Sequence, residues 1–154
     1  MNTNNKIYLD ANFLTFWALP KDEEIKKKVR VLLAMFLARR VEMTSSCLAL
    51  DEMWFSVKKT YNGLNNETKS CFDEPIYSLF NNFTIELLNK VTLLQFDNPN
   101  EGTKKALDYI KNFKLKPRDA FHLALMNNHS IPEIITDDSD FKNIADIAKI
   151  QVSF

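Results

Sequence analysis

Hydrophobic residues along the chain follow two different spacings. Short apolar runs rich in aliphatic residues predict strands, because a strand covered on both faces is apolar at nearly every position. Longer stretches in which apolar residues recur every three or four positions predict amphipathic helices. We expect strands at 6–10, 41–46, 91–96, 133–136 and 149–154. We expect helices at 22–40, 48–61, 67–90 with an interruption or offset at Pro75, 101–113 and 117–129, and a short helical turn after the fourth strand.

Local signals mark the ends of two of these helices. Asn62-Gly63 predicts the end of the helix at 48–61, since both residue types tolerate the left-handed backbone that often closes a helix. Pro117 is expected in the first turn of its helix, where the missing N–H would have no partner in any case. A Phe13, Phe16 and Trp17 cluster follows the first strand and is expected to pack in the core.

The order of elements predicts the fold class. Strands that are separated by helical crossovers form parallel sheets whose faces are covered by the helices. We therefore expect an α/β fold: a three-layer α/β/α sandwich with a central, mostly parallel, five-stranded sheet. The chain has 154 residues and no long Pro-, Gly- or Ser-rich linker, so a single domain over residues 1–154 is expected.

Composition excludes several functional classes. Two glycines cannot form a dinucleotide-binding fingerprint or a Walker A loop, and two scattered Cys and two His are a poor match to a four-ligand zinc site. The longest apolar run, Val31–Ala38, is far shorter than the ~20 residues that cross a bilayer, so no membrane association is expected. The N-terminus is polar and resembles no targeting segment, and a cytoplasmic protein with reduced cysteines is the expectation.

Charge is balanced overall but unevenly distributed. The 20 basic and 20 acidic residues cancel, yet residues 104–118 carry six basic residues against one acid. Residues 119–141 carry five acids and no Lys or Arg. Such polarity is compatible with polyanion binding through one face, and equally with solvated helix faces that happen to balance.

Acidic residues follow strands or begin helices at four separate places. Asp10 ends the first strand, Glu52 lies early in the helix after the second, and Asp119 lies in the first turn after Pro117. Asp138 and Asp140 follow the fourth strand. Glu52, Asp119 and Asp140 could each simply stabilise a helix N-terminus, whereas Asp10, at the end of an apolar strand, has little structural use there. If they converge at the carboxyl edge of the sheet, their mutual repulsion calls for a compensating proton or a hard divalent cation such as Mg²⁺ or Mn²⁺.

These residues, in this order, resemble the PIN domain family, and in particular the VapC-like toxin ribonucleases of toxin–antitoxin pairs. The resemblance spans the whole chain and rests on IYLDAN at 7–12, Ser46 followed by Glu52, PRDAFH at 117–122 and TDDSDF at 136–141.

The resemblance implies a set of site residues. The acidic quartet of the family falls on Asp10, Glu52, Asp119 and Asp138, with Asp140 as an auxiliary acid and metal ligand; Asn12 and Thr136 match small polar supporting residues. Two departures stand out. Ala49 replaces the usual Thr or Ser three residues before the glutamate. Asp51 and Asp137 are neighbours that compete for the second and fourth positions, although the spacing favours Glu52 and Asp138.

The implied activity is a metal-dependent endoribonuclease that uses Mg²⁺ or Mn²⁺ and leaves a 5′-phosphate and a 3′-hydroxyl. The implied partners are RNA, a cognate antitoxin and a second copy of the chain in a homodimer. Because the acidic site would repel phosphate, RNA is expected to approach along basic residues that lead toward Asp119. The candidates are Lys104, Lys105, Lys111, Lys114, Lys116 and Arg118.

Two other functions remain open at the level of sequence. One is a catalytically silent PIN-like module that binds RNA or protein. The other is a haloacid-dehalogenase-like phosphohydrolase, against which Asn12 argues, because those enzymes need an acid two residues after the first. His122 shares a helix face with Asp119 but is expected to be a packed core imidazole, and His129 a capping or surface residue. Trp54, like Trp17, is expected in the core, with a partner-binding surface as the alternative.

Overall fold

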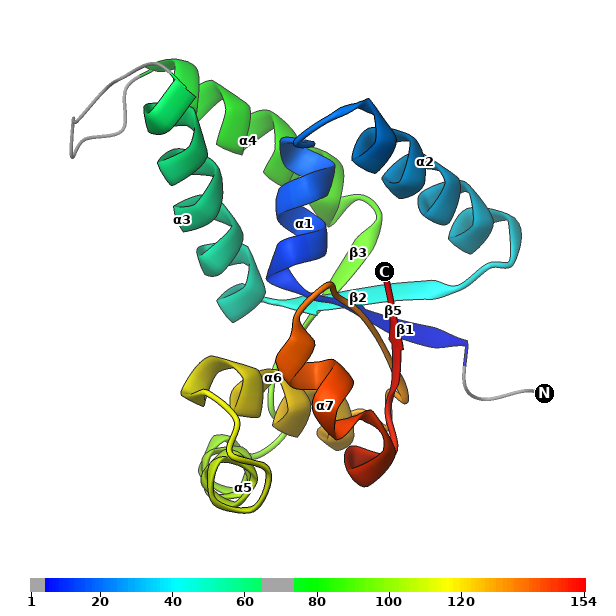
Figure 1. Cartoon of the computed structure of the whole chain (residues 1–154), viewed down its shortest axis with the longest axis vertical. Coiled ribbons are helices and arrows are strands. Elements are labelled where there is room, and N and C mark those ends of the chain that lie inside the picture. Colours follow the sequence, from blue (N-terminus) through cyan, green and yellow to red (C-terminus); the bar gives the residue numbers. More distant parts are fainter. Residues whose placement is uncertain (1–4, 65–73) are drawn as a thin grey trace.

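The computed structural model describes residues 5–64 and 74–154. Within these ranges the chain forms five strands and seven helices (Figure 1). In chain order they are β1 (Lys6–Leu9), α1 (Ala11–Ala18), α2 (Glu23–Ala38), β2 (Glu42–Ser46), α3 (Cys47–Leu64), α4 (Glu74–Leu88), β3 (Val91–Leu94), α5 (Pro99–Phe113), α6 (Pro117–Asn128), β4 (Glu133–Ile135), α7 (Ser139–Ala148) and β5 (Gln151–Ser153).

All strand pairs of the sheet are parallel, and the strand order is β3-β2-β1-β4-β5. The first three strands are added in one direction, and the chain then crosses to the other side of β1 for β4 and β5. The order therefore reverses between β1 and β4. Crevices at such a reversal, beyond the carboxyl ends of the strands, are where open α/β sheets bind ligands.

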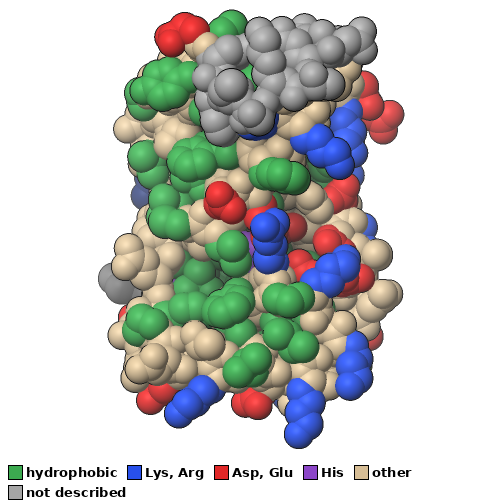
Figure 2. All heavy atoms as spheres, turned by 90° about the vertical axis from the view of Figure 1, so that its left-hand side faces the viewer, with side chains coloured by type: hydrophobic (Ala, Val, Ile, Leu, Met, Phe, Trp, Pro, Cys, Tyr) green, Lys and Arg blue, Asp and Glu red, His purple; other side chains and the backbone are tan. Residues whose placement is uncertain are grey.

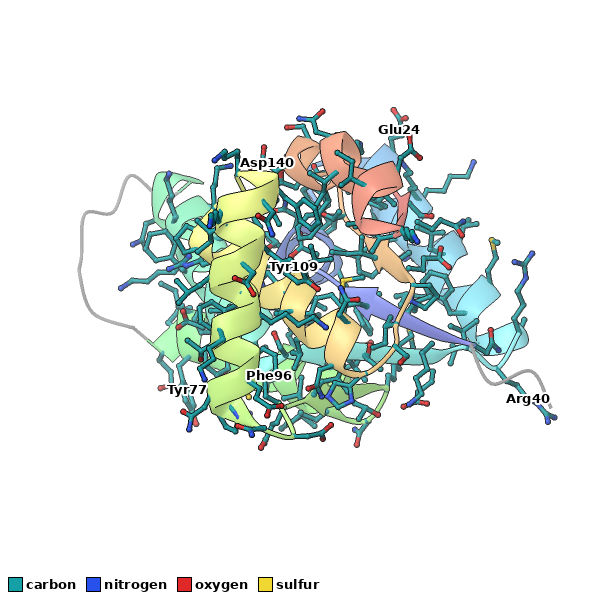
Figure 3. The ribbon with its side chains drawn as sticks, turned by 90° about the horizontal axis from the view of Figure 1, so that it is seen from below. Glu24, Arg40, Tyr77, Phe96, Tyr109 and Asp140 are labelled. Carbon is teal, nitrogen blue, oxygen red and sulfur yellow. The ribbon has the colours of Figure 1, made fainter. Side chains whose placement is uncertain are left out.

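Two hydrophobic cores lie on opposite faces of the sheet. Alternate residues of β1 divide between them: Ile7 and Leu9 pack with α1–α4, while Tyr8 packs with α5–α7. Figure 1 shows the same division, with α1–α4 above the sheet and α5–α7 below it. Figure 3 shows α5 outermost on its side, with α6 between it and the sheet. The predicted three-layer α/β/α sandwich with a parallel five-stranded sheet is confirmed.

Several predicted boundaries were wrong for identifiable reasons. Helix α1 was not predicted as a helix, because Ala11, Phe13, Leu14 and Phe16 are all buried and leave no amphipathic period. The prediction that Asn62-Gly63 ends its helix was also wrong: α3 continues to Leu64, and Gly63 does not have a positive φ. The expected short turn after β4 is the ten-residue helix α7. The part of the predicted helix at 67–73 lies outside the described residues.

Other local expectations are confirmed. Pro117 begins α6, and His129 caps its C-terminus, with Nε2 2.7 Å from the carbonyl oxygen of Gln95. Trp17 and Trp54 are only partly buried at the edge of the core, where Trp17 packs edge-on against Phe83 and Trp54 stacks on Phe80, so the core expectation holds for them in part. None of the helices in the described ranges combines the length and the apolar character needed to span a bilayer.

Gly102 is required by the packing of α5 rather than by its backbone conformation. A Cβ at this position would lie 2.6 Å from Cγ of Phe96, and the ring of Phe96 packs against that of Phe121 of α6. Gly102→Ala should therefore destabilise the protein by about 1–2 kcal/mol, because the clash outweighs the ~1 kcal/mol that Ala contributes as a better helix former. Urea unfolding would measure the change. Gly63→Ala is the matched control: no described atom lies within 4 Å of its Cβ position, so this variant should be neutral or slightly more stable.

Candidate metal centre

Asp10 is held at the carboxyl end of β1 in an almost fully buried position. It is 5% exposed and follows three buried strand residues. Its Oδ2 accepts a 2.6 Å hydrogen bond from Oγ1 of Thr136, which is itself fully buried after β4. Burial raises the pKa of Asp10, while nearby His122 and the Thr136 hydrogen bond act in the opposite direction. An acid in this position therefore carries an electrostatic cost that calls for compensation.

Thr136 also organises the acids after β4. Its Oγ1 accepts the backbone N–H of Asp138 at 3.0 Å. Asp138 in turn caps α7, its Oδ1 accepting the N–H of Asp140 at 2.8 Å. One oxygen of Asp138 thus serves as a helix cap, a role that the sequence did not predict for this acid. One Asp138 oxygen, one from Asp119 and one from Asp140 all lie within 4.8 Å of one another, a group able to hold a cation.

Asp119 projects into this cluster from the first turn of α6. Its Oδ2 is buried and has no hydrogen-bond partner among the described residues. Burial, followed by the negative charge of Asp138, raises the pKa of Asp119 to about 6. Desolvation and repulsion from Asp138 therefore both act against the charged form of Asp119.

A second group of possible ligands adjoins the first and consists of Asp10, Glu52 and His122, with one atom from each within 4.8 Å of the others. His122 is 1% exposed, and its Nε2 lies 3.6 Å from Oε2 of Glu52 and 3.9 Å from Oδ1 of Asp10. Burial alone would lower the pKa of His122, but the neighbouring Glu52 and Asp10 outweigh it and raise the pKa. His122 is buried, as expected for a core imidazole, but its ring faces the acids. The only sequence signal for this location is its position three residues after Asp119 on the same helix.

On the other side of the ring, His122 is fixed by two hydroxyl groups. Its Nδ1 lies 2.7 Å from the phenol oxygen of Tyr8, which lies 2.7 Å from Oγ of Ser46. Ser46 Oγ also accepts the backbone N–H of Ala49 at 3.1 Å. Burial raises the pKa of Tyr8, so the phenol stays protonated. These polar contacts connect β1, β2, α3 and α6 next to the acids.

Two of the six predicted basic residues lie directly at the acids. Lys116 Nζ is 2.8 Å from Oδ2 of Asp140, and Arg118 Nε is 3.2 Å from Oε1 of Glu52. The hydrogen bond to Asp140 raises the pKa of Lys116. The other four are solvent-exposed and precede these two in the chain: Lys104, Lys105 and Lys111 on α5, and Lys114 at its C-terminal cap.

The acids open to solvent through a cleft of about 380 Å³. It is lined by residues of α3, α6 and the β4–α7 connection: Glu52, Lys116, Pro117, Arg118, Asp119 and Asp138. Figure 2 shows acidic and basic side chains gathered at the middle of this face, between two apolar areas.

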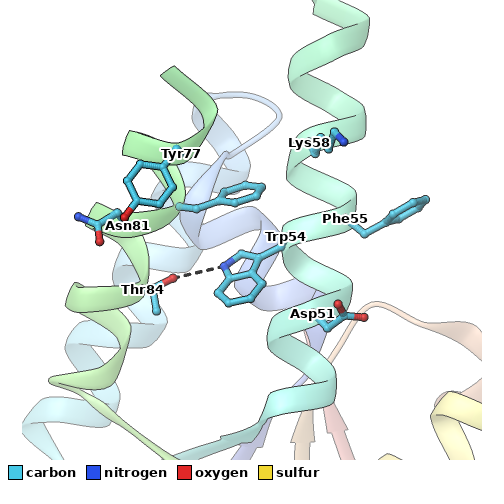
Figure 4. A pocket seen from close by; sticks show the side chains of 8 residues that line it. Asp51, Trp54, Phe55, Lys58, Tyr77, Asn81 and Thr84 are labelled. Atoms are coloured by element: carbon cyan, nitrogen blue, oxygen red, sulfur yellow. Dashed lines mark hydrogen bonds between the residues drawn. The ribbon is translucent and has the colours of Figure 1, made fainter. Parts of the chain in front are cut away.

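Three residues considered alongside the site lie outside the acidic cleft. Asn12 and exposed Asp137 line a separate hollow with residues of α1 and α3, so Asp138, not Asp137, stands beside Asp119. Asp51 lines an apolar groove of about 630 Å³ between α3 and α4 (Figure 4). Within that groove Nε1 of Trp54 donates a 3.3 Å hydrogen bond to Thr84, and the ring of Phe55 is 66% exposed. This larger groove carries no comparable group of acids.

The arrangement can now be compared with known proteins. The sequence model of the PIN domain family matches residues 7–147, which include all five clustered acids. The chain belongs to the PIN domain family. Among curated proteins, none matches this PIN domain by sequence.

Solved structures with the same fold include a protein described as a toxin and a member of a family of toxin–antitoxin systems. VapC20 of Mycobacterium tuberculosis, described as a sarcin-ricin loop cleaving toxin, is 16% identical, with a TM-score of 0.62 over 89% of this chain and 93% of that one. VapBC2 of Rickettsia felis, bound to a promoter DNA fragment, is 11% identical, with a TM-score of 0.60 over 96% and 97%. FitAcB of Neisseria gonorrhoeae is 17% identical, with a TM-score of 0.57 over 96% of both chains. At these identities the similarity establishes the shared fold.

The raised pKa of Asp119 predicts that this acid destabilises the metal-free protein. An aspartate that binds its proton more tightly when folded lowers stability as the pH rises from about 4 through 6, and its full cost persists above that range. At pH 8 with EDTA, Asp119→Asn should raise the free energy of unfolding by roughly 1–2 kcal/mol, a value reduced for the partial exposure of the group. The gain should vanish near pH 4.

Urea unfolding of both proteins at the two pH values measures this effect. Asp137→Asn is the matched control, because Asp137 is an exposed acid next to Asp138 in the chain and lies outside the cluster. If Asp119→Asn is no more stable than the original protein at pH 8, the carboxylates are not crowded enough to repel one another.

Proposed function

We propose that this PIN domain is a divalent-metal-dependent endoribonuclease and the toxin of a type II toxin–antitoxin pair. The observation that carries the proposal is the gathering of five carboxylates from four chain segments in two adjoining groups, three of them lining one cleft. Buried oxygens of Glu52 and Asp119 lack a hydrogen bond among the described residues, although that of Glu52 faces Arg118 across an ion pair. Family membership supports nuclease chemistry, and the similarity in fold to a toxin and to a member of a toxin–antitoxin family supports a toxin that pairs with an antitoxin.

The donor set fits a hard divalent cation. Carboxylate oxygens are the ligands that Mg²⁺ and Mn²⁺ prefer, and the buried oxygens lacking partners are groups that a cation would satisfy. Asp10, Asp119 and Asp138 would hold the ion, with Glu52 and Asp140 as further ligands or as orienting groups for water. A bound Mg²⁺ or Mn²⁺ would supply Lewis-acid stabilisation of phosphate charge and a lower pKa for bound water.

The residues of the chain position the acids that would hold the ion and the water that would attack the phosphate. Thr136 fixes the orientation of both Asp10 and Asp138 through a single hydroxyl. Glu52 faces the cleft and would orient the attacking water. Hydrolysis adds the water oxygen to phosphorus, breaks the bond from phosphorus to the 3′-oxygen, and leaves a 5′-phosphate and a 3′-hydroxyl that takes up a proton. No protein nucleophile takes part in this reaction.

Substrate approach depends on the basic residues. The acids would repel an RNA backbone, and Lys104, Lys105, Lys111 and Lys114 provide exposed positive charge along and beyond α5. Lys116 and Arg118 lie at the cleft itself and would exchange their carboxylate partners for phosphate oxygens when RNA binds. Because phosphate contacts carry no base information, this surface would give affinity without sequence preference. RNA as a substrate places the activity in the cytoplasm, and we propose that the chain acts as a homodimer in complex with its antitoxin.

Cleavage of labelled RNA with Mg²⁺ or Mn²⁺ tests the activity. We expect cleavage that EDTA abolishes and that Asp119→Asn reduces by at least ~100-fold, because the variant removes a charged ligand. Asp137→Asn should retain activity. Binding without cleavage would support the silent PIN-like module instead, and release of phosphate from a small phosphomonoester would support the haloacid-dehalogenase-like alternative. Growth arrest on expression, relieved by an adjacent small gene, would identify the toxin role.

The proposed RNA path gives a separate prediction on ionic strength. In the non-cleaving Asp119→Asn protein, the triple change of Lys104, Lys105 and Lys111 to Gln should reduce the slope of log Kd against log salt by about 2, since each single-stranded phosphate contact contributes ~0.7. Fluorescence anisotropy with a labelled RNA measures the slope. The matched control changes three exposed basic residues of and beside α2, Lys27, Arg30 and Arg39, to Gln. Equal slopes in the two variants would place the RNA path elsewhere.

A further inference from the structure

His122 occupies an unusual environment for a buried histidine. It lies one turn after Asp119 on α6 and is 1% exposed, yet its Nε2 has no hydrogen-bond partner among the described residues. Buried polar atoms in folded proteins are almost always hydrogen-bonded. The closest acceptors, Oε2 of Glu52 at 3.6 Å and Oδ1 of Asp10 at 3.9 Å, are beyond the range of an N–H···O hydrogen bond. The imidazole therefore faces two carboxylates without bonding to either.

These separations match those between ligands of one cation. Atoms that each lie ~2.1 Å from a shared ion are ~3–4 Å apart, depending on the angle between them. Oδ2 of Asp119 is likewise buried without a hydrogen-bond partner in the described part of the chain, whereas Oε1 of Glu52 lacks a hydrogen bond but faces Nε of Arg118 at 3.2 Å. Two polar atoms of the site, one on His122 and one on Asp119, thus share the same deficit, which a bound cation would remove.

The contacts on the far side of the ring determine which nitrogen can bind a metal. Nδ1 lies 2.7 Å from the Tyr8 hydroxyl, and that hydroxyl lies 2.7 Å from Ser46 Oγ. If Nδ1–H donates to Tyr8 and Tyr8 donates to Ser46, every contact has one donor and one acceptor, and the lone pair of Nε2 is directed at Glu52 and Asp10. Histidines that bind metals usually donate their other N–H in this way, which fixes both tautomer and ring orientation.

We propose that His122 supplies a nitrogen ligand, through Nε2, to the divalent ion that Asp10 and Glu52 hold, with Tyr8 as the positioning residue. This deepens the proposed function, on which it rests for the presence of a metal. A nitrogen ligand would change which divalent ion the site binds most tightly. Imidazole nitrogen suits transition ions, whereas Mg²⁺ prefers oxygen ligands only, so this site should favour Mn²⁺ over Mg²⁺.

The decisive test is spectroscopic and needs no RNA. With Mn²⁺ alone added to the full chain, pulsed electron paramagnetic resonance should show coupling of the bound ion to a ¹⁴N nucleus, and His122→Gln should remove it. Calorimetric titration should show Mn²⁺ affinity falling about 10–100-fold in His122→Gln while Mg²⁺ affinity changes less than about threefold. His129→Gln is the matched control, because His129 caps the same helix away from the acids and should leave the nitrogen signal intact.

Tyr8→Phe tests the positioning role. It keeps the ring packing but removes the acceptor of Nδ1–H, so Mn²⁺ affinity should fall while the nitrogen coupling persists at saturating metal. Bound Mn²⁺ without nitrogen coupling, or unchanged affinity in His122→Gln, would overturn the proposal and leave His122 as a group that only faces the carboxylates. The wild-type spectrum decides the question even if the variant fails to fold.

The outcomes also separate this inference from the proposed function. Metal-dependent RNA cleavage without nitrogen coupling would refute the ligand role and retain the nuclease. Nitrogen coupling in a protein that cleaves no RNA would retain the ligand role and refute the nuclease.

Discussion

The hydroxyl of Thr136 joins the two halves of the sheet where the strand order reverses. It donates to Asp10 after β1 and accepts the N–H of Asp138 after β4. One buried group therefore sets the spacing between Asp10 and Asp138. The backbone supports the same junction, because Asp10 N–H donates to the carbonyl of Ile135 and Thr136 N–H to that of Ser153. Since the residues that precede it on the two strands, Leu9 and Ile135, are fully buried, this junction has little freedom to relax. The acids are therefore held close together by the fold even where their charges oppose it.

That rigidity explains why the site costs stability and why a bound cation would relieve that cost. A carboxylate in water is free to move away from another, but Asp10 and Asp119 are fixed by β1 and α6 and lose solvation as well as separation. The raised pKa of both acids expresses this cost. Sites that are prepared for a ligand in this way commonly destabilise the empty protein, and binding of the ligand recovers the stability. The hydrophobic cores on the two faces of the sheet supply the excess stability that makes such an arrangement tolerable.

The sequence predicted the layers of the fold and the convergence of the acids, because both follow from rules that act locally or through topology. Apolar runs at 91–96 and 133–136 predicted strands, and the carboxyl ends of parallel strands must share an edge. Helix α1 could not be predicted by periodicity, since it is buried nearly all round between the sheet, α2 and α3. Gly63 was misread because its residue type permits a left-handed turn without requiring one. The direction of the His122 ring was beyond sequence reasoning, because it depends on Tyr8 and Ser46, which are distant along the chain.

The basic residues at the cleft connect the resting structure to substrate binding. Lys116 and Arg118 neutralise part of the acidic cluster, yet both are largely exposed, at 69% and 60% of their side-chain surface. Exposed ion pairs contribute little net free energy, because solvent competes for both partners. Each side chain can therefore leave its carboxylate for a phosphate at small cost, and the oxygens of Glu52 and Asp140 that it releases become available to a cation. Buried His122 has no such freedom: its ring is held by Tyr8 whether or not RNA is present. The site thus combines mobile positive charge at its mouth with a fixed imidazole at its base. In the proposed ribonuclease, this division would let RNA bind without moving His122.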